Sequence, residues 1–180
     1  MGVVTLIYYA KLNCEDCPAQ TLKSLQHIKK IESLRLEALK GIDNKPSVIL
    51  LLESTPANRF IYDPDSVYVN SGLRYNLRKE FKVRSDSQLF EFMNKYKIWI
   101  VDVALCPLHK LDKKALRRKA ATICLSRHTK VYLETFEKAR IIAIFPSSCG
   151  FLKNKIPNIQ QRIQKQFRFN DFEGLTDWVR

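Results

Sequence analysis

Glycine is scarce in this sequence, which has 5 glycines among 180 residues. The phosphate-binding loops of nucleotide-binding enzymes need several closely spaced glycines, because only glycine lets the backbone come so close to a phosphate group. The sequence contains no loop of that kind. An α/β enzyme that acts on free nucleotides therefore ranks last among the functions considered.

Long apolar segments are also missing. The N-terminal apolar run, residues 2–9, is shorter than the core of a signal peptide and lacks a basic start, and a spanning helix needs about 20 apolar residues. The 5 cysteines of a chain without an export signal indicate a reducing compartment. We therefore expect a cytoplasmic protein that does not enter membranes and that acts as a monomer.

Acidic residues are outnumbered, with 18 Asp and Glu against 31 Lys and Arg and a net charge of +13. Such an excess favours a polyanionic partner, and nucleic acid ranks ahead of an anionic membrane. Basic residues are densest at positions 110–130, where the only acid is Asp112. We predict that Lys113, Lys114, Arg117 and Arg118 bind DNA, and the alternative is a solvated helix face without a partner.

Apolar periodicity predicts alternating strands and helices. The continuous apolar run at residues 48–52 and the mostly apolar segments at residues 98–105 and 140–145 are typical of strands buried on both faces. Helical spacing predicts helices over residues 18–40, 71–81, 85–96 and 112–136, the last with a break near Ser126. The chain length suits one domain, residues 1–180. We predict an α/β fold, a three-layer sandwich with a central, mostly parallel sheet and helices on both faces.

Polar residues follow the predicted strands. Ligands of parallel sheets bind beyond the carboxyl ends of the strands. In this sequence those ends carry Glu53 and Ser54, then residues 102–106, then residues 146–149. We predict that the functional site lies at this edge, with residues 57–69 as a long binding loop beside it.

The cysteines form two candidate pairs. Cys14 and Cys17 are separated by two residues, a spacing that lets two thiolates bind one metal or cluster from a tight turn. Cys106 follows the second strand, and Cys124 lies in the next helix. Together they are a candidate metal site. Two alternatives stay open, namely buried thiols without a metal, and zinc bound by Cys14, Cys17, Cys106 and His109.

The order and spacing of these segments resemble those of the iron-sulfur uracil-DNA glycosylases of thermophilic bacteria and archaea. That family has a C-x2-C-Pro start, a strand ending in Gly-Glu-Ala-Pro-Gly, a strand running into Asn-x-x-Lys-Cys-Arg-Pro, and a fourth cysteine further on. The corresponding segments here are residues 14–18, 52–56 and 102–107, followed by Cys124. The resemblance covers residues 14–148 and implies the uracil-DNA glycosylase-like form of the predicted fold.

What the resemblance implies is base-excision DNA repair. The protein would bind double- or single-stranded DNA and cleave the N-glycosidic bond of a damaged or deaminated base. A structural 4Fe-4S cluster would be held by Cys14, Cys17, Cys106 and Cys124.

The resemblance also assigns roles in a base pocket. Glu53 would position water or stabilise charge on the sugar, and Asp102 would be the second catalytic residue. Phe60 would stack on the extruded base. Ser147 and Ser148, which follow the third strand, are base-binding candidates of this chain itself that could donate hydrogen bonds but cannot supply the charge of the family's late histidine.

Three departures from the family motifs bear on activity. Asp102 stands where the family has asparagine. Because an ionised carboxylate only accepts hydrogen bonds, Asp102 would repel the O4 carbonyl of uracil and would favour a base that offers two donors. Leu52 and Pro56 replace the motif glycines, and no histidine follows His128 to stabilise the leaving base. Structural roles are the alternatives, with Glu53 capping a turn, Asp102 anchoring a strand and Phe60 packing in the core. The alternative for the whole chain is a non-catalytic nucleic-acid-binding protein with the same fold.

Overall fold

Four strands form one parallel sheet in the structure, a computed structural model that describes residues 16–22, 25–54, 60–66, 72–144, 159–168 and 171–180. β1 (Val48–Ser54), β2 (Ile98–Ala104) and β3 (Arg140–Ala143) correspond to the three predicted strands, and β4 (Ile163–Gln166) completes the order β2-β1-β3-β4. Each pair of neighbours is parallel. The sequence does not predict β4, because only one of its residues is apolar and three of them are exposed.

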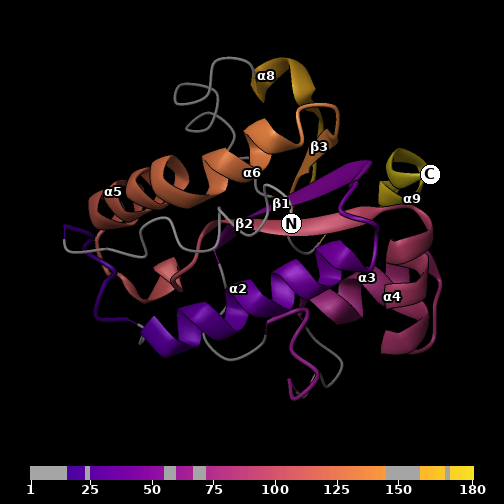
Figure 1. Cartoon of the computed structure of the whole chain (residues 1–180), viewed down its shortest axis with the longest axis horizontal. Helices are drawn as coiled ribbons and strands as arrows, with labels where there is room; N and C mark the ends of the chain where they lie inside the picture. The colour runs from indigo at the N-terminus through magenta and orange to yellow at the C-terminus, as the bar shows by residue number, and fades with distance from the viewer. Residues whose placement is uncertain (1–15, 23–24, 55–59, 67–71, 145–158, 169–170) are drawn as a thin grey trace.

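Helices pack around the strands (Figure 1). They are α2 (Leu25–Lys40), α3 (Leu73–Phe81), α4 (Asp86–Lys95), α5 (Lys114–Cys124), α6 (Lys130–Thr135), α8 (Ile159–Arg162) and α9 (Leu175–Val179), with a short 3-10 turn η1 (Leu108–Lys110). The helices from α2 to α6 fall within the predicted segments, but residues 18–22 form turns ahead of α2, and the sequence does not predict α8 or α9. Ser85 caps α4, its Oγ accepting a hydrogen bond from the backbone N of Gln88 at 3.2 Å. In place of the break predicted near Ser126, a π-helical turn, η2 (Leu125–Thr129), joins α5 to α6.

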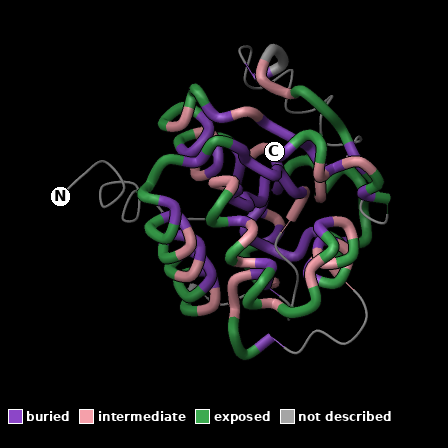
Figure 2. The backbone as a smooth tube through the Cα atoms, turned by 90° about the vertical axis from the view of Figure 1, so that its right-hand side faces the viewer, coloured by how far each residue is buried: buried purple, intermediate pink, exposed green. Residues whose placement is uncertain are grey.

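The sheet is buried on both faces. Successive side chains of a strand point to opposite faces, so neighbouring residues enter different core clusters. Ile49 and Trp99 pack in the cluster that includes residues of α5 and α6, whereas Leu50 and Ile100 pack with residues of α3, α4 and α9. Figure 2 shows the buried strands enclosed by helices whose outer sides are exposed. The predicted α/β arrangement, with helices on both faces of a parallel sheet, is confirmed.

The strand order creates a switch point between β1 and β3. The chain passes from β1 to β2 on one side and then returns to β3 on the other side of β1. Doubly wound sheets of this kind bind ligands in the crevice at the switch point, outside the carboxyl ends of the strands. Glu53 and Ser54 end β1 at this edge, and the chain leaving β2 enters α5 from the same side (Figure 1). None of the described helices combines the length and the apolar character that crossing a membrane requires.

Candidate functional site

A buried charged cluster lies at the carboxyl half of β2. Asp102 is 3% exposed, and its Oδ2 accepts a hydrogen bond from Nη2 of Arg35 at 2.6 Å. Arg35, fully buried in α2, donates through Nη1 to Glu32, and Glu32 also accepts a hydrogen bond from the hydroxyl of Tyr132 in α6. The cluster therefore connects α2, β2 and α6 inside the protein.

An aromatic ring covers the same guanidinium group. Cζ of Arg35 lies over the ring of Phe60, 5.4 Å from its centroid. Phe60 is 3% exposed and packs edge-on against Tyr62, with 5.6 Å between ring centroids. The hydroxyl of Tyr62 accepts a hydrogen bond from the backbone N of Ile100 at 2.8 Å, and burial raises the pKa of Tyr62, so the phenol stays neutral.

The structure thus brings two predicted base-pocket residues, Phe60 and Asp102, into contact with one group. That group is the guanidinium of Arg35, which packs on the ring of Phe60 and donates to Asp102. Asp102 is ion-paired inside the protein and its backbone carbonyl accepts a hydrogen bond from Thr129 Oγ1 at 2.9 Å. This placement favours the anchoring alternative for Asp102 over a role at an open pocket.

Glu32 and Arg35 are not among the residues predicted from the sequence, although α2 contains a signal for them. Ile31, Leu36 and Leu39 are buried in α2 at spacings of three to five residues, and Glu32 and Arg35 fall in the same stripe. A stripe with this period faces the core. Two opposite charges within it therefore indicate a buried ion pair.

Glu53 occupies the position before the last residue of β1 and is half-buried. Alternation along the strand places Glu53 on the face of Leu51, whereas Asp102 follows Ile100 on the opposite face. The two predicted catalytic carboxylates therefore share an edge of the sheet but leave it on different faces. The remaining predicted base-site residues, Ser147 and Ser148, lie outside the described residues.

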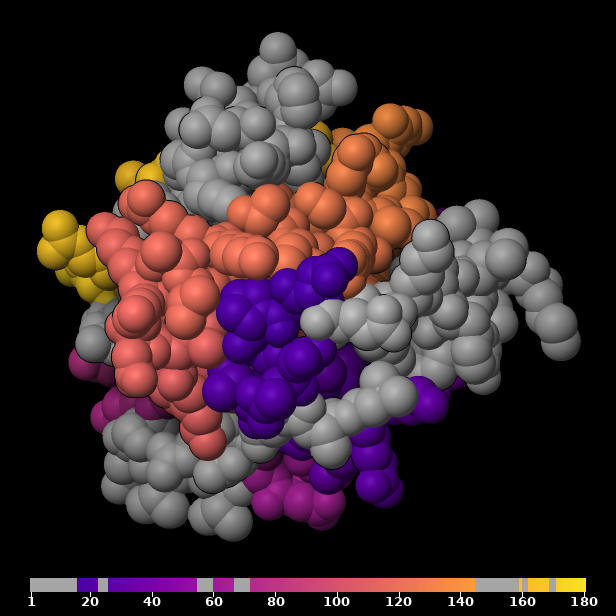
Figure 3. Space-filling model, turned by 90° about the vertical axis from the view of Figure 1, so that its left-hand side faces the viewer, coloured from indigo at the N-terminus to yellow at the C-terminus, as the bar shows by residue number. Residues whose placement is uncertain are grey.

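Cysteines from three segments of the chain lie around one small cavity. Cys17, Cys106 and Cys124 are buried and line the same small cavity. The Sγ of Cys124 accepts a hydrogen bond from the backbone N of Leu105 at 3.3 Å. Figure 3 shows residues 16–22 packed against the salmon-coloured surface that includes α5. Cys14, the fourth predicted ligand, lies outside the described residues.

The donor type of this cavity suits a soft metal or an iron-sulfur cluster, since thiolates are their usual ligands. The cavity as packed has a volume of about 10 Å³, enough for about one water molecule. Over the described ranges, no group of three or more His, Cys, Asp or Glu residues is arranged to hold a metal ion. A four-iron cluster therefore requires the lining side chains to move apart. His109, a ligand in the zinc alternative, is exposed and does not line the cavity.

The helix α5 carries the basic surface and contains no acidic residue. Lys113, Lys114 and Arg118 are exposed, whereas Arg117 is half-buried and its Nε donates to the carbonyl of Leu111 at 2.5 Å. Arg117 therefore stabilises the turn that leads into α5, and the other three cations are the ones that face solvent. This surface lies on the side of the molecule shown in Figure 3, and α5 follows the carboxyl end of β2 (Figure 1).

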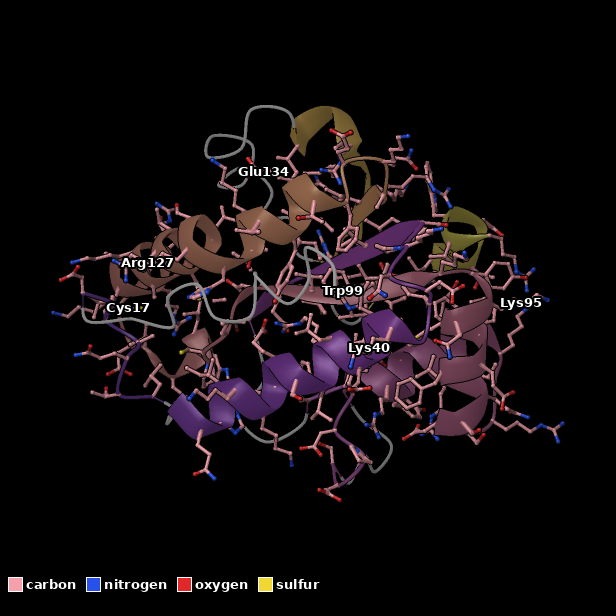
Figure 4. All side chains as sticks on the ribbon, in the orientation of Figure 1. Cys17, Lys40, Lys95, Trp99, Arg127 and Glu134 are labelled. Carbon is pink, nitrogen blue, oxygen red and sulfur yellow. The ribbon has the colours of Figure 1, made fainter. Side chains whose placement is uncertain are left out.

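A partly buried histidine lies in the π-helical turn. Burial, followed by the positive charges of Arg127 and Arg35, lowers the pKa of His128 to about 4. Within the part of the chain that the structure describes, its Nε2 is buried and has no hydrogen-bond partner. Arg127 itself pairs with Asp16 at 3.6 Å, close to Cys17 (Figure 4). His128 is therefore neutral at pH 7.

The sequence matches no protein-family model, no curated protein and no solved structure. The described part of the chain combines an exposed basic helix, a buried guanidinium-carboxylate cluster and a thiol-lined cavity near the carboxyl end of β2.

Proposed function

We propose that this protein binds DNA through the exposed face of α5 and shares the architecture of the uracil-DNA glycosylase superfamily. The observation that carries the proposal is the exposed basic run at the start of α5, which no acid interrupts. It lies at the edge where parallel sheets bind their ligands. Lysine and arginine that neutralise phosphates release counterions, so binding through this face weakens steeply as salt increases.

Charge reversal on α5 tests this proposal. The triple variant Lys113→Glu, Lys114→Glu and Arg118→Glu should weaken binding to a labelled DNA duplex on the order of 100-fold, because phosphate contacts are replaced by repulsion. The slope of log K against log salt should fall by about 3, one unit for each lost contact. Fluorescence anisotropy over a salt series measures both quantities.

A matched control separates the α5 surface from net charge alone. Lys79→Glu, Arg84→Glu and Lys95→Glu change the charge by the same amount at exposed positions near α3 and α4, far from α5 (Figures 1 and 4). This control should retain most of the affinity. Equal weakening in both triple variants, or unchanged binding in the α5 variant, contradicts a DNA interface on α5.

Base excision is the second candidate function, and it rests on the resemblance in sequence. Phe60 and Asp102 lie close enough together to contact one group, which in this structure is Arg35. For excision, Arg35 must leave the position between them. Glu53, which leaves the same edge of the sheet on the other face, would have to reach the sugar from there to position the attacking water. Abasic-site formation on oligonucleotides carrying uracil, hypoxanthine, xanthine or an alkylated base tests this function. Loss of activity in Glu53→Ala would identify Glu53 as a catalytic residue. If none of the oligonucleotides is cleaved, the function that remains is DNA binding without catalysis.

The thiol-lined cavity supports a cofactor proposal. A 4Fe-4S cluster bound by Cys14, Cys17, Cys106 and Cys124 would link the N-terminal segment to β2 and α5, in a structural role. Anaerobically purified protein should contain about four iron atoms per chain, and Cys124→Ser should lower this to below about one. Cys149→Ser is the matched control and should keep its iron. If the protein is colourless and contains one zinc per chain, and His109→Ala loses that zinc, the zinc site is supported instead. Protein that contains neither metal supports buried thiols without a metal.

A further inference from the structure

One of the two tryptophans of the chain lies on the surface. Trp99 is fully buried in β2, whereas Trp178, in α9, is 36% exposed. Lys165, an exposed residue of β4, has its Nζ over the ring of Trp178, 5.6 Å from the centroid. The same Nζ lies 6.0 Å from the centroid of Phe167, which is buried in the core. An exposed indole with a cation beside it offers both a stacking face and a positive charge.

A second cation lies beside aromatic rings at the end of the same helix. Arg180 is exposed, and its Cζ lies 6.0 Å from the ring centroids of both Phe92 and Tyr96, which are half-buried at the end of α4. Arg180 follows Trp178 by two residues, so the two side chains belong to one surface. Figure 2 shows this side of the molecule, with the C-terminal end of α9 facing the viewer. We call Lys165, Trp178 and Arg180 the α9 surface.

The other exposed aromatic of the described helices, Tyr75, has different surroundings. Tyr75 is also 36% exposed, and it lines an open groove of about 750 Å³ between α3 and α9. The charged residues that line this groove are four acids and three bases, namely Glu80, Asp171, Glu173 and Asp177, and Lys79, Lys82 and Arg180. The groove therefore has no excess of positive charge, whereas both charged members of the α9 surface are cations.

We propose that the α9 surface binds single-stranded nucleic acid. An unpaired base stacks on Trp178, and Lys165 and Arg180 neutralise the phosphates on either side of it. Every base has a flat face, so this binding does not depend on sequence. A duplex keeps its bases stacked on one another and offers only phosphates to such a surface. Since α9 and α5 lie at opposite ends of the molecule in Figure 1, this site is separate from the duplex interface proposed on α5.

Tryptophan fluorescence reports the stacking directly, because Trp99 is buried and only Trp178 can meet a base. A thymidine oligonucleotide of about ten nucleotides should quench the emission of Trp178. A strand of the same length that carries no bases has the same charge, and it should bind about 10-fold more weakly and should not quench. A uridine oligonucleotide of equal length compares RNA with DNA, and the lower Kd shows which of the two the surface prefers.

Variants separate stacking from charge. Trp178→Ala should weaken binding of a labelled thymidine oligonucleotide about 10-fold in fluorescence anisotropy, whereas Trp178→Tyr should keep most of the affinity, because tyrosine also stacks. Tyr75→Ala is the matched control, since it removes an equally exposed aromatic, and it should not change the affinity. Lys165→Ala/Arg180→Ala should lower the slope of log K against log salt by about 1.4, or about 0.7 for each lost phosphate contact.

The same titrations in the triple charge-reversal variant of α5 separate this inference from the proposed function. Quenching by the thymidine oligonucleotide should persist in that variant. The inference is overturned by loss of quenching there, by no quenching in the wild-type protein, or by equal affinity for the strand without bases. Quenching by vesicles of phosphatidylserine and phosphatidylcholine, but not by either oligonucleotide, also overturns it in favour of a membrane surface. Duplex binding through α5 is measured with its own probe, so either proposal can fail while the other holds.

Discussion

Arg35→Met is expected to lower the free energy of unfolding by about 3–5 kcal/mol, because it leaves buried carboxylates without their counter-charge. Methionine keeps much of the side-chain volume, so the loss reflects charge more than packing. Asp102 is 3% and Glu32 7% exposed, so water cannot replace the lost donors without opening the core. Urea denaturation followed by circular dichroism measures the change.

A control on the same helix separates this effect from any loss of a cation. Lys40 pairs with Glu37 at 2.9 Å, but both side chains are more than half exposed. Lys40→Met should therefore change stability by at most about 1 kcal/mol. A similarly small change in Arg35→Met contradicts the buried ion cluster. The double variant Arg35→Met/Asp102→Leu should recover part of the stability, because it removes one uncompensated charge.

Stability should fall between pH 7 and pH 4.5 through the protonation of His128. The folded-state pKa is lowered to about 4, below the ordinary value of 6.5, so the unfolded chain binds the proton first as pH falls. The contribution of neutral His128 to the free energy of unfolding is therefore fully present above pH 6.5 and is lost as the pH falls toward 4. The linkage relation gives a loss of about 2 kcal/mol by pH 4.5.

Comparison of the wild-type protein with His128→Gln isolates this contribution, since the carboxylates titrate in both. The free energy of unfolding at pH 7 and pH 4.5 should differ by about 2 kcal/mol less in the variant. His109→Gln, at an exposed position in η1, should show the same change in free energy of unfolding between pH 7 and pH 4.5 as the wild-type protein. Identical pH dependence in His128→Gln and the wild-type protein contradicts a neutral, buried His128.

The strands and helices could be predicted because their signals are local. The segments that form β1, β2 and β3 are mostly apolar, and such segments are stable only when neighbouring strands satisfy their backbone hydrogen bonds. The exposed β4 lacks that signal. The meeting of Cys17, Cys106 and Cys124 was also predictable in outline, since Cys106 follows a strand end and Cys124 lies in the helix that packs beside it.

The surroundings of Phe60 and Asp102 could not be predicted in the same way. An aromatic after a strand either stacks on a ligand or fills the core, and the difference depends on what covers it. In this structure Arg35 and Tyr62 pack against Phe60, and the ring is buried. Likewise, the exposure of Arg118 and the partial burial of Arg117 depend on how α5 sits on η1.

The sequence alone determined the parallel sheet, its covering helices and the basic character of α5, because apolar period and charge density are properties of short segments. Only the tertiary structure decided the partner of Asp102. Arg35 lies 67 positions away in the chain, and the two side chains meet because α2 packs beside β2. Whether a carboxylate faces a ligand or an internal cation depends on distance and burial, and neither is contained in a local pattern.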